Sequence, residues 1–205
     1  TGNITSSVSG SAPNGGISIR NNAAATPGNI GIVDGAMAGN SVRFSHGGSD
    51  LVLTASHSFE VDNGGDLAIL AGSNMTLNAG GPFINVPGAA SSVLLGAVGA
   101  MDFAGAFSLP NNNLGLAAAT IQVDSAVDAK NIAVVAGALN ISNSGGLHAD
   151  NHLLAVVAGD VDITGGYIKT TSGDLEMLVG GDLNINDSGH IWAGYTQMSP
   201  PYADA

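Results

Sequence analysis

Hydrophobic and polar residues alternate with a period of two through most of the chain. In the segment 51–61 the residues of one parity are mostly apolar: Leu51, Leu53, Ala55, His57, Phe59 and Val61. Those of the other parity are mainly polar: Val52, Thr54, Ser56, Ser58 and Glu60. This alternation indicates an extended strand with one side in a core and the other toward water. Helical periodicity is nearly absent, so the pattern predicts an all-β protein.

The strand-like segments recur along the chain. The strings AVVAGALNISNSGG from Ala133, AVVAGDVDITGG from Ala155 and MLVGGDLNINDSG from Met177 place equivalent positions 22 residues apart. Earlier copies follow at 16 to 26 residues, bounded by glycine pairs that suit sharp corners. Short strands at this period with one apolar face are typical of a β-solenoid, in which each turn pairs with its neighbours. We predict a right-handed parallel β-helix of about eight coils with three short sheets.

Aligning the copies on an apolar doublet predicts two inward ladders. The first positions of the doublets are Val42, Phe59, Met75, Met101, Ile121, Leu139, Val161 and Leu183. The second positions are Phe44, Val61, Leu77, Phe103, Val123, Ile141, Ile163 and Ile185. The intervening residues are expected to form an outward row in which Arg43 lies beside Glu60 and no two neighbours share a charge, as stacked strands require.

The repeat pattern divides the chain into three parts. Residues 1–40 form an irregular N-terminal segment with further strands at Ile17/Ile19 and Ile30/Ile32. Residues 41–196 form the solenoid, and residues 197–205, which include Pro200-Pro201, form a tail that leaves it. The sequence starts at Thr1 without a signal-like segment, so we expect a mature or excised fragment.

Composition narrows the classes of partner. The chain has 205 residues with 31 glycines, 16 acidic and four scattered basic residues, and a formal net charge of −12. Nucleic acid is therefore a poor partner, because no basic patch exists to contact phosphates. No apolar run approaches the ~20 residues of a membrane span, so membrane insertion is not expected. Without cysteine there are no disulfides or thiolate metal sites.

Three strings carry a family resemblance. GDLAILAG from Gly65, GDVDI from Gly159 and GDLNIN from Gly181 resemble the degenerate repeats of filamentous-haemagglutinin-like β-helix passengers, which bacteria export by two-partner or autotransporter systems. The resemblance covers roughly residues 42–195. It implies a secreted or surface-anchored fibrous protein of adhesion, matrix or filament formation, and it carries no catalytic residues over to this chain.

Polar candidates for chemistry are few. Asp160 and Asp162 share a strand face at the spacing of an acid–base pair, but the equivalent positions in neighbouring coils hold varied polar residues, which favours ordinary outward sites. Asp182 and other aspartates at glycine corners suit Ca²⁺, although the calcium β-roll motif is absent and such aspartates commonly cap turns. His148 and His152 flank a carboxylate in a loop and are weak candidates for a metal. We therefore expect neither a catalytic site nor a cofactor, with Ca²⁺ as the ligand to test.

Apolar residues at outward positions are the most informative feature. Strand parity and the nearest repeat copy predict an exposed apolar stripe made of Leu70, Ile132, Val134, Leu154, Val156 and Leu178. Such a stripe is usually an interface, which favours lateral association. The single tryptophan, Trp192, is a further candidate for contact with a partner or a sugar.

These observations predict a non-enzymatic structural or adhesive protein of the cell surface or extracellular space. Its solenoid rod forms, or belongs to, a fibre or filament by self-association, and a host or matrix glycan or protein serves as receptor. The alternative is a carbohydrate-binding or polysaccharide-degrading β-helix with Asp160, Asp162 and Trp192 as its candidates. An ice-binding solenoid is disfavoured because the threonines do not align in one row.

Overall fold

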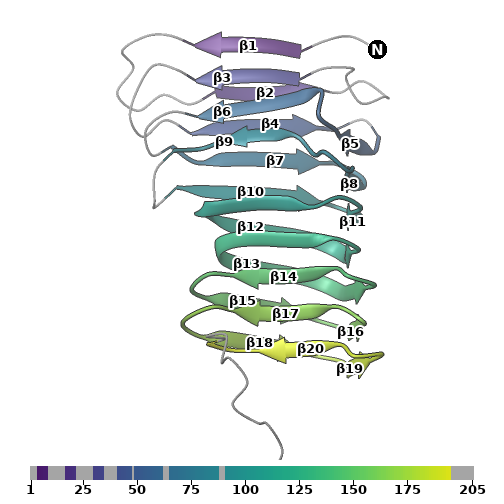
Figure 1. The fold of residues 1–205 in the computed structure, drawn as a ribbon. Helices are drawn as coiled ribbons and strands as arrows, with labels where there is room; N and C mark the ends of the chain where they lie inside the picture. Colours follow the sequence, from purple (N-terminus) through teal and green to yellow (C-terminus); the bar gives the residue numbers. More distant parts are fainter. Residues whose placement is uncertain are drawn as a thin grey trace, which may run out of the picture.

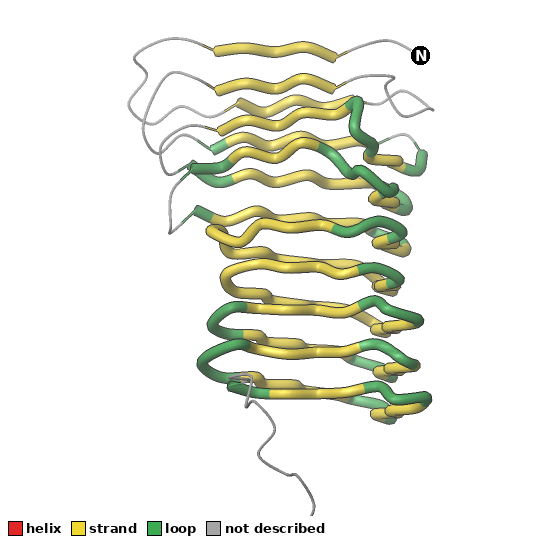
Figure 2. The backbone as a smooth tube through the Cα atoms, in the orientation of Figure 1, coloured by secondary structure: helices red, strands yellow, loops and turns green. Residues whose placement is uncertain are grey.

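The structure, a computed structural model, describes residues 41–47, 49–61, 65–87 and 91–194, together with the strand backbones at 4–8, 17–21 and 30–34. All regular elements in these residues are β-strands, and the described part holds no helix that is long and apolar enough to cross a membrane. The strands stack from β1 at the top to β18–β20 at the bottom (Figure 1). Loops turn the corners between them (Figure 2). The predicted parallel β-solenoid is thus confirmed, with about seven turns.

From β4 onward each full turn contributes one strand to each of three faces, and all pairings between turns are parallel. The first face contains β2 (Ile17–Asn21), β4 (Val42–His46), β7 (Leu67–Ala71), β10 (Ser92–Ala97), parts of β12 (Phe107–Val123) and β13 (Ala126–Ser142), β15 (Leu153–Val157) and β18 (Leu175–Val179). The second contains β5 (Leu51–Leu53), β8 (Met75–Leu77), β11 (Ala100–Phe103), parts of β12 and β13, β16 (Val161–Thr164) and β19 (Leu183–Asn186). The third contains β1 (Ile4–Val8), β3 (Ile30–Asp34), β6 (His57–Val61) and β9 (Phe83–Asn85) above, and parts of β12 and β13, β14 (Gly146–Ala149), β17 (Tyr167–Thr170) and β20 (His190–Trp192) below.

The third face is interrupted halfway down. Strands β12 and β13 run through all three faces, so most of the solenoid is one sixteen-stranded sheet, whereas β1, β3, β6 and β9 form a separate four-stranded sheet. No ladder joins β9 to β12 in the described residues. The buried Asn112 spans the break, because its Nδ2 donates a 2.7 Å hydrogen bond to the carbonyl oxygen of Val86 in the turn above.

The inward ladders of the second face follow the prediction from Met75 to Leu183 and from Leu77 to Ile185. The prediction is wrong above Met75, where the preceding turn contributes Leu51 and Leu53. Val42/Phe44 belong to the first face and Phe59/Val61 to the third, so Arg43 lies beside Ala68 rather than Glu60. Counting these two doublets as coils of the same ladder is what gave about eight turns instead of about seven.

The string match between copies hides a one-residue shift on the first face. Aligning AVVAG with AVVAG pairs Ala133 with Ala155, whereas the structure pairs Val134 with Ala155. The repeat returns to register by Gly137 and Gly159, whose backbones are hydrogen-bonded. Ala158 is therefore an extra corner residue, and it reverses the expected parity of the strand above. Ile132 and Val134, predicted to point outward, are buried in the core.

Glycines at the corners serve two purposes. Gly165 has a φ of +71°, the conformation that the corner prediction required. Gly145 instead allows close approach, because a Cβ there would collide with the carbonyl oxygen of Val123 in the turn above. At that corner the positive φ, +58°, falls on Asn143.

The predicted strands near Ile17 and Ile30 are confirmed as β2 and β3. The rest of the N-terminal segment 1–40, apart from β1, and the tail 197–205 lie outside the described residues.

Candidate functional site

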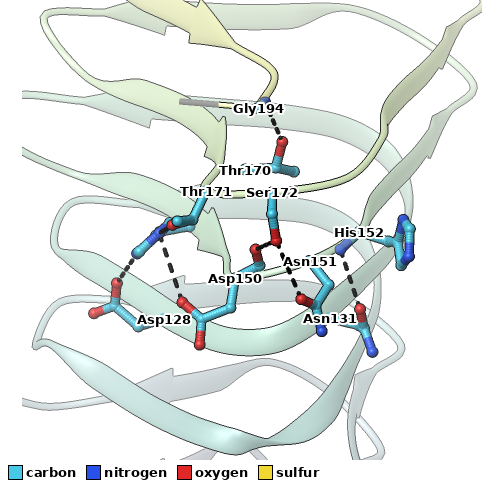
Figure 3. Close-up of polar contacts among 10 residues, drawn as sticks. Asp128, Asn131, Asp150, Asn151, His152, Thr170, Thr171, Ser172 and Gly194 are labelled. Carbon is cyan, nitrogen blue, oxygen red and sulfur yellow. Dashed lines mark hydrogen bonds and ion pairs between the residues drawn. The ribbon is translucent and has the colours of Figure 1, made fainter. Parts of the chain in front are cut away.

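A row of polar and aromatic side chains runs down the lower part of the third face, from β12 to β20. It is set by the parallel register, which stacks Ser108, Asp128, His148, Lys169 and Trp192 in successive turns. Each follows an inward apolar residue on its strand, so alternation directs all five side chains outward. The strands that carry this row end at the corner between the third and the first face, and polar side chains of the corner loops lie close together there (Figure 3).

Three side chains of this region form a hydrogen-bonded series across three turns. Nδ1 of His148 lies 2.9 Å from Oδ1 of Asp128, and Nε2 lies 2.7 Å from Oγ1 of Thr171. Asp150 approaches the same Nε2 at 3.9 Å. His148 is mostly buried between the turns above and below, while Thr171 is exposed.

This carboxylate–imidazole–hydroxyl order is the one that nucleophilic triads use. A triad also needs N–H groups free to hold an oxyanion. Here the N–H of Thr171 donates to the carbonyl oxygen of Ala149, and that of Ser172 to the carbonyl oxygen of Asp150. Backbone pairing between turns thus uses the N–H groups of Thr171 and of the residue that follows it. What the series does is fix the corner by cross-linking three turns.

A second polar series lines the adjoining edge of the first face. Nδ2 of Asn131 donates to Oδ1 of Asn113 at 2.7 Å, and Oδ1 of Asn131 accepts from the N–H of His152 at 3.1 Å. Nδ1 of His152 in turn accepts from the N–H of Asp174 at 3.3 Å. Ser172 adds bonds to the carbonyl oxygen of Asp150 and to Oδ1 of Asn151 (Figure 3). His148 and His152 therefore belong to separate series and do not converge on one point.

The predicted aspartates also stabilise the stack. Oδ1 of Asp160 accepts the N–H of Asp182 from the turn below at 2.8 Å, and Oδ1 of Asp162 accepts Nδ2 of Asn184 at the same distance. Asp160 and Asp182 lie at a corner, whereas Asp162 lies within the second face. No group of three or more metal-ligating side chains occurs in the described residues. The aspartates considered for Ca²⁺ are therefore not grouped into a coordination shell in the described residues.

Burial and a neighbouring carboxylate raise the pKa of two side chains, one on the second face and one on the third. Burial and the nearby Asp124 carboxylate raise the pKa of Asp102, whose Oδ1 is buried without a hydrogen bond. Burial and the Asp128 carboxylate raise the pKa of Tyr167. The ring of Tyr167 packs where a Cβ of Gly146 would lie, and Nζ of Lys169 sits 4.7 Å from its centroid.

The outward side of the first face is apolar over most of its length. One column holds Arg43, Ala68, Leu94, Gly115, Ala133, Leu154 and Glu176. The other holds Ser45, Leu70, Gly96, Ala117, Val135, Val156 and Leu178. We call these two columns the apolar face. The prediction placed Leu70, Leu154, Val156 and Leu178 in it correctly, but its middle is filled by Ala133 and Val135, not by Ile132 and Val134.

Trp192 is 39% exposed and stacks on His190 at a centroid distance of 4.6 Å. It lies on the third face, away from Asp162 on the second, so the carboxylates and the tryptophan that the carbohydrate hypothesis grouped do not share a site. The roles of Asp128 and Thr171 could not be predicted from the sequence, because these residues contact His148 from 20 and 23 residues away and only the register between turns reveals the contact.

A scan against protein-family models finds no match for this chain. Searches of curated proteins and of solved structures likewise find none. The fold and its register therefore carry the functional argument.

Proposed function

We propose that the chain is a structural, adhesive component of an extracellular or cell-surface fibre, built by stacking β-solenoid turns end to end. The lower end of the described solenoid carries this proposal. Leu183 and Ile185 occupy inward ladder positions whose counterparts Val161 and Ile163 are fully buried, yet they are 46% and 45% exposed. In the described residues no strand pairs with the lower edges of β18, β19 and β20.

An end of this kind favours another turn beneath it. Its strand edges present backbone groups ready for parallel pairing, and its apolar ladder positions gain burial when covered. Further turns, whether from a longer chain or from another copy, continue the ladders without new types of contact. The resemblance of the GDL-containing repeats to filamentous-haemagglutinin-like passengers supports a secreted, adhesive rod.

Fibre growth of the purified chain tests this proposal. Growth is followed by light scattering and negative-stain electron microscopy for the wild type, Ile185→Asp and the matched control Asn186→Asp. We expect fibres from the wild type and the control, and none from Ile185→Asp, because its carboxylate would be buried against the next turn. Circular dichroism establishes that each variant keeps its β-structure. Dispersed wild-type monomers, or fibres of Ile185→Asp equal to those of the control, would contradict the proposal.

Glycan binding is a second candidate function, and the exposed Trp192–His190 stack favours it. Aromatic rings at a surface offer a sugar an apolar platform with a polar edge. Isothermal titration with neutral and acidic polysaccharides, comparing the wild type with Trp192→Ala, tests this function. Binding that survives the substitution unchanged removes the assignment to this stack.

A further inference from the structure

The apolar face differs in composition from the outward row of the second face. Eleven of its 14 positions in the two columns are alanine, glycine, valine or leucine, whereas the corresponding row of the second face is mainly polar: Val52, Thr76, Asp102, Gln122, Asn140, Asp162 and Asn184. Val135, in the fifth of the seven levels, is 59% exposed. In a chain with a net charge of −12, the only charged residues in the seven levels of the two columns are Arg43 and Glu176, in the first and the seventh level. Strand β2 continues the columns above them and places Ser18 in register with Arg43 and Arg20 in register with Ser45.

The glycines make this face flat. A Cβ on Gly96 would come within 2.8 Å of Cδ2 of Leu70, and one on Gly115 within 3.2 Å of Cδ1 of Leu94. Both leucine side chains therefore lie down over a glycine of the next turn instead of standing out from the sheet. A flat apolar sheet face packs well against another such face, at a sheet separation of about 10 Å.

We propose that two copies of this chain pair laterally through the apolar face with their rods antiparallel. The two-fold axis that relates them lies between the two faces, parallel to the strand of Gly115 and Ala117 and level with it. This axis maps each column onto itself and reverses the order of its seven turns. The fourth turn then faces its own copy, as an isologous interface requires.

The order of residues along the columns matches this symmetry. Arg43 in the first turn faces Glu176 of the second copy, and the reverse pair forms at the other end. In the first column Ala68 faces Leu154, and Leu94 faces Ala133. In the second column Gly96 faces Val135. Leu70 faces Val156 in that column, so both side chains are large there. A large side chain thus meets a small one in three of the four pairings at the second and third levels, while Gly115 and Ala117 meet their own copies at the axis.

Parallel rods do not give the same match. A two-fold axis along the rod would bring each turn onto itself, so Arg43 would lie near Arg43 of the second copy and Glu176 near Glu176. Like charges would then gather at both ends, which costs free energy at an interface. Charge complementarity therefore selects the antiparallel arrangement.

The size of the face suits a modest interface. Seven strands about 4.8 Å apart and about five residues wide cover roughly 550 Å² on each copy, or about 1,100 Å² in total. This total lies near the lower limit for a specific protein–protein interface, about 1,000–1,200 Å². Interfaces of this size are typical of weak pairing, so we expect a reversible dimer at high protein concentration. Lateral pairing and end-to-end stacking use different surfaces, so the two proposals stand or fall separately.

Sedimentation equilibrium measures the pairing in the Ile185→Asp background, which blocks end stacking. We expect twice the 20.1 kDa chain mass for this background and for the added control Val52→Asp on the second face, but a monomer for added Val135→Asp. Glu176→Arg should weaken the dimer at least tenfold, and Arg43→Glu together with Glu176→Arg should restore it. A monomeric background, or a dimer insensitive to Val135→Asp, overturns lateral pairing.

Spin-label distances test the orientation. The chain contains no cysteine, so Gln122→Cys and Asn184→Cys each give one label, in the fourth and seventh turns of the second face. Antiparallel pairing separates the two Asn184 labels along the rod by about 29 Å more than the two Gln122 labels, because each lies three turns from the axis. Equal distances at the two sites would overturn the antiparallel arrangement.

Discussion

Val134 and Val135 are adjacent residues of one type with opposite environments, and their truncation tests the register of the solenoid. Val134 is 0% exposed, whereas Val135 points outward from the apolar face. Val134→Ala removes two methyl groups, about 1.6 kcal/mol of transfer free energy. The cavity left behind, on the order of 50 Å³, adds roughly 1 kcal/mol. We therefore expect Val134→Ala to lower the free energy of unfolding by about 2–3 kcal/mol.

Val135→Ala should change the free energy of unfolding by no more than about 0.5 kcal/mol, as is usual for exposed positions. Urea unfolding followed by circular dichroism measures both variants, at two protein concentrations so that association through the apolar face is recognised. Equal losses, or a larger loss for Val135→Ala, would refute the register. That outcome would restore the alignment of AVVAG with AVVAG.

Three further predictions concern stability. Asp102→Asn should stabilise the fold at pH 7, because the pKa of Asp102 is raised in the folded chain and its ionisation therefore favours the unfolded chain. This gain in the free energy of unfolding should vanish below the ordinary pKa of 3.8, and unfolding measured as a function of pH tests it. Gly145→Ala should cost roughly 2–3 kcal/mol because its Cβ meets the Val123 carbonyl, whereas Gly31→Ala, with no atom within 4 Å of its Cβ, should cost far less in the same urea assay. Asn112→Leu should cost about 1–3 kcal/mol by leaving the Val86 carbonyl unpaired, and hydrogen exchange should rise around β9.

The sequence predicted the parts of the fold that depend on local alternation. Inward and outward parity within a strand follows from the period of two, so the ladder from Met75 to Leu183 could be predicted in full. The assignment of strands to faces could not, because Val42/Phe44 and Phe59/Val61 have the same alternation as a second-face doublet. Only the pairing between turns, which is set by corner lengths, distinguishes the three faces.

Local likeness also misled the prediction of the candidate interface. The repeated AVVAG string concealed the extra residue Ala158, and a shift of one residue exchanges the two sides of a strand. The Asp128–His148–Thr171 series was invisible for a related reason. Its members come from three turns, and their contact depends on register rather than on spacing along the chain.

Oriented fibre diffraction tests the central claim, that the chain is a structural rod, most directly. Fibres assembled from the wild-type chain should give a meridional reflection near 4.8 Å, because the stacking direction of the turns would lie along the fibre axis. The same reflection on the equator would place the stacking direction of the turns perpendicular to the fibre axis and contradict end-to-end stacking. A preparation that yields no fibres at any concentration would contradict the structural role itself.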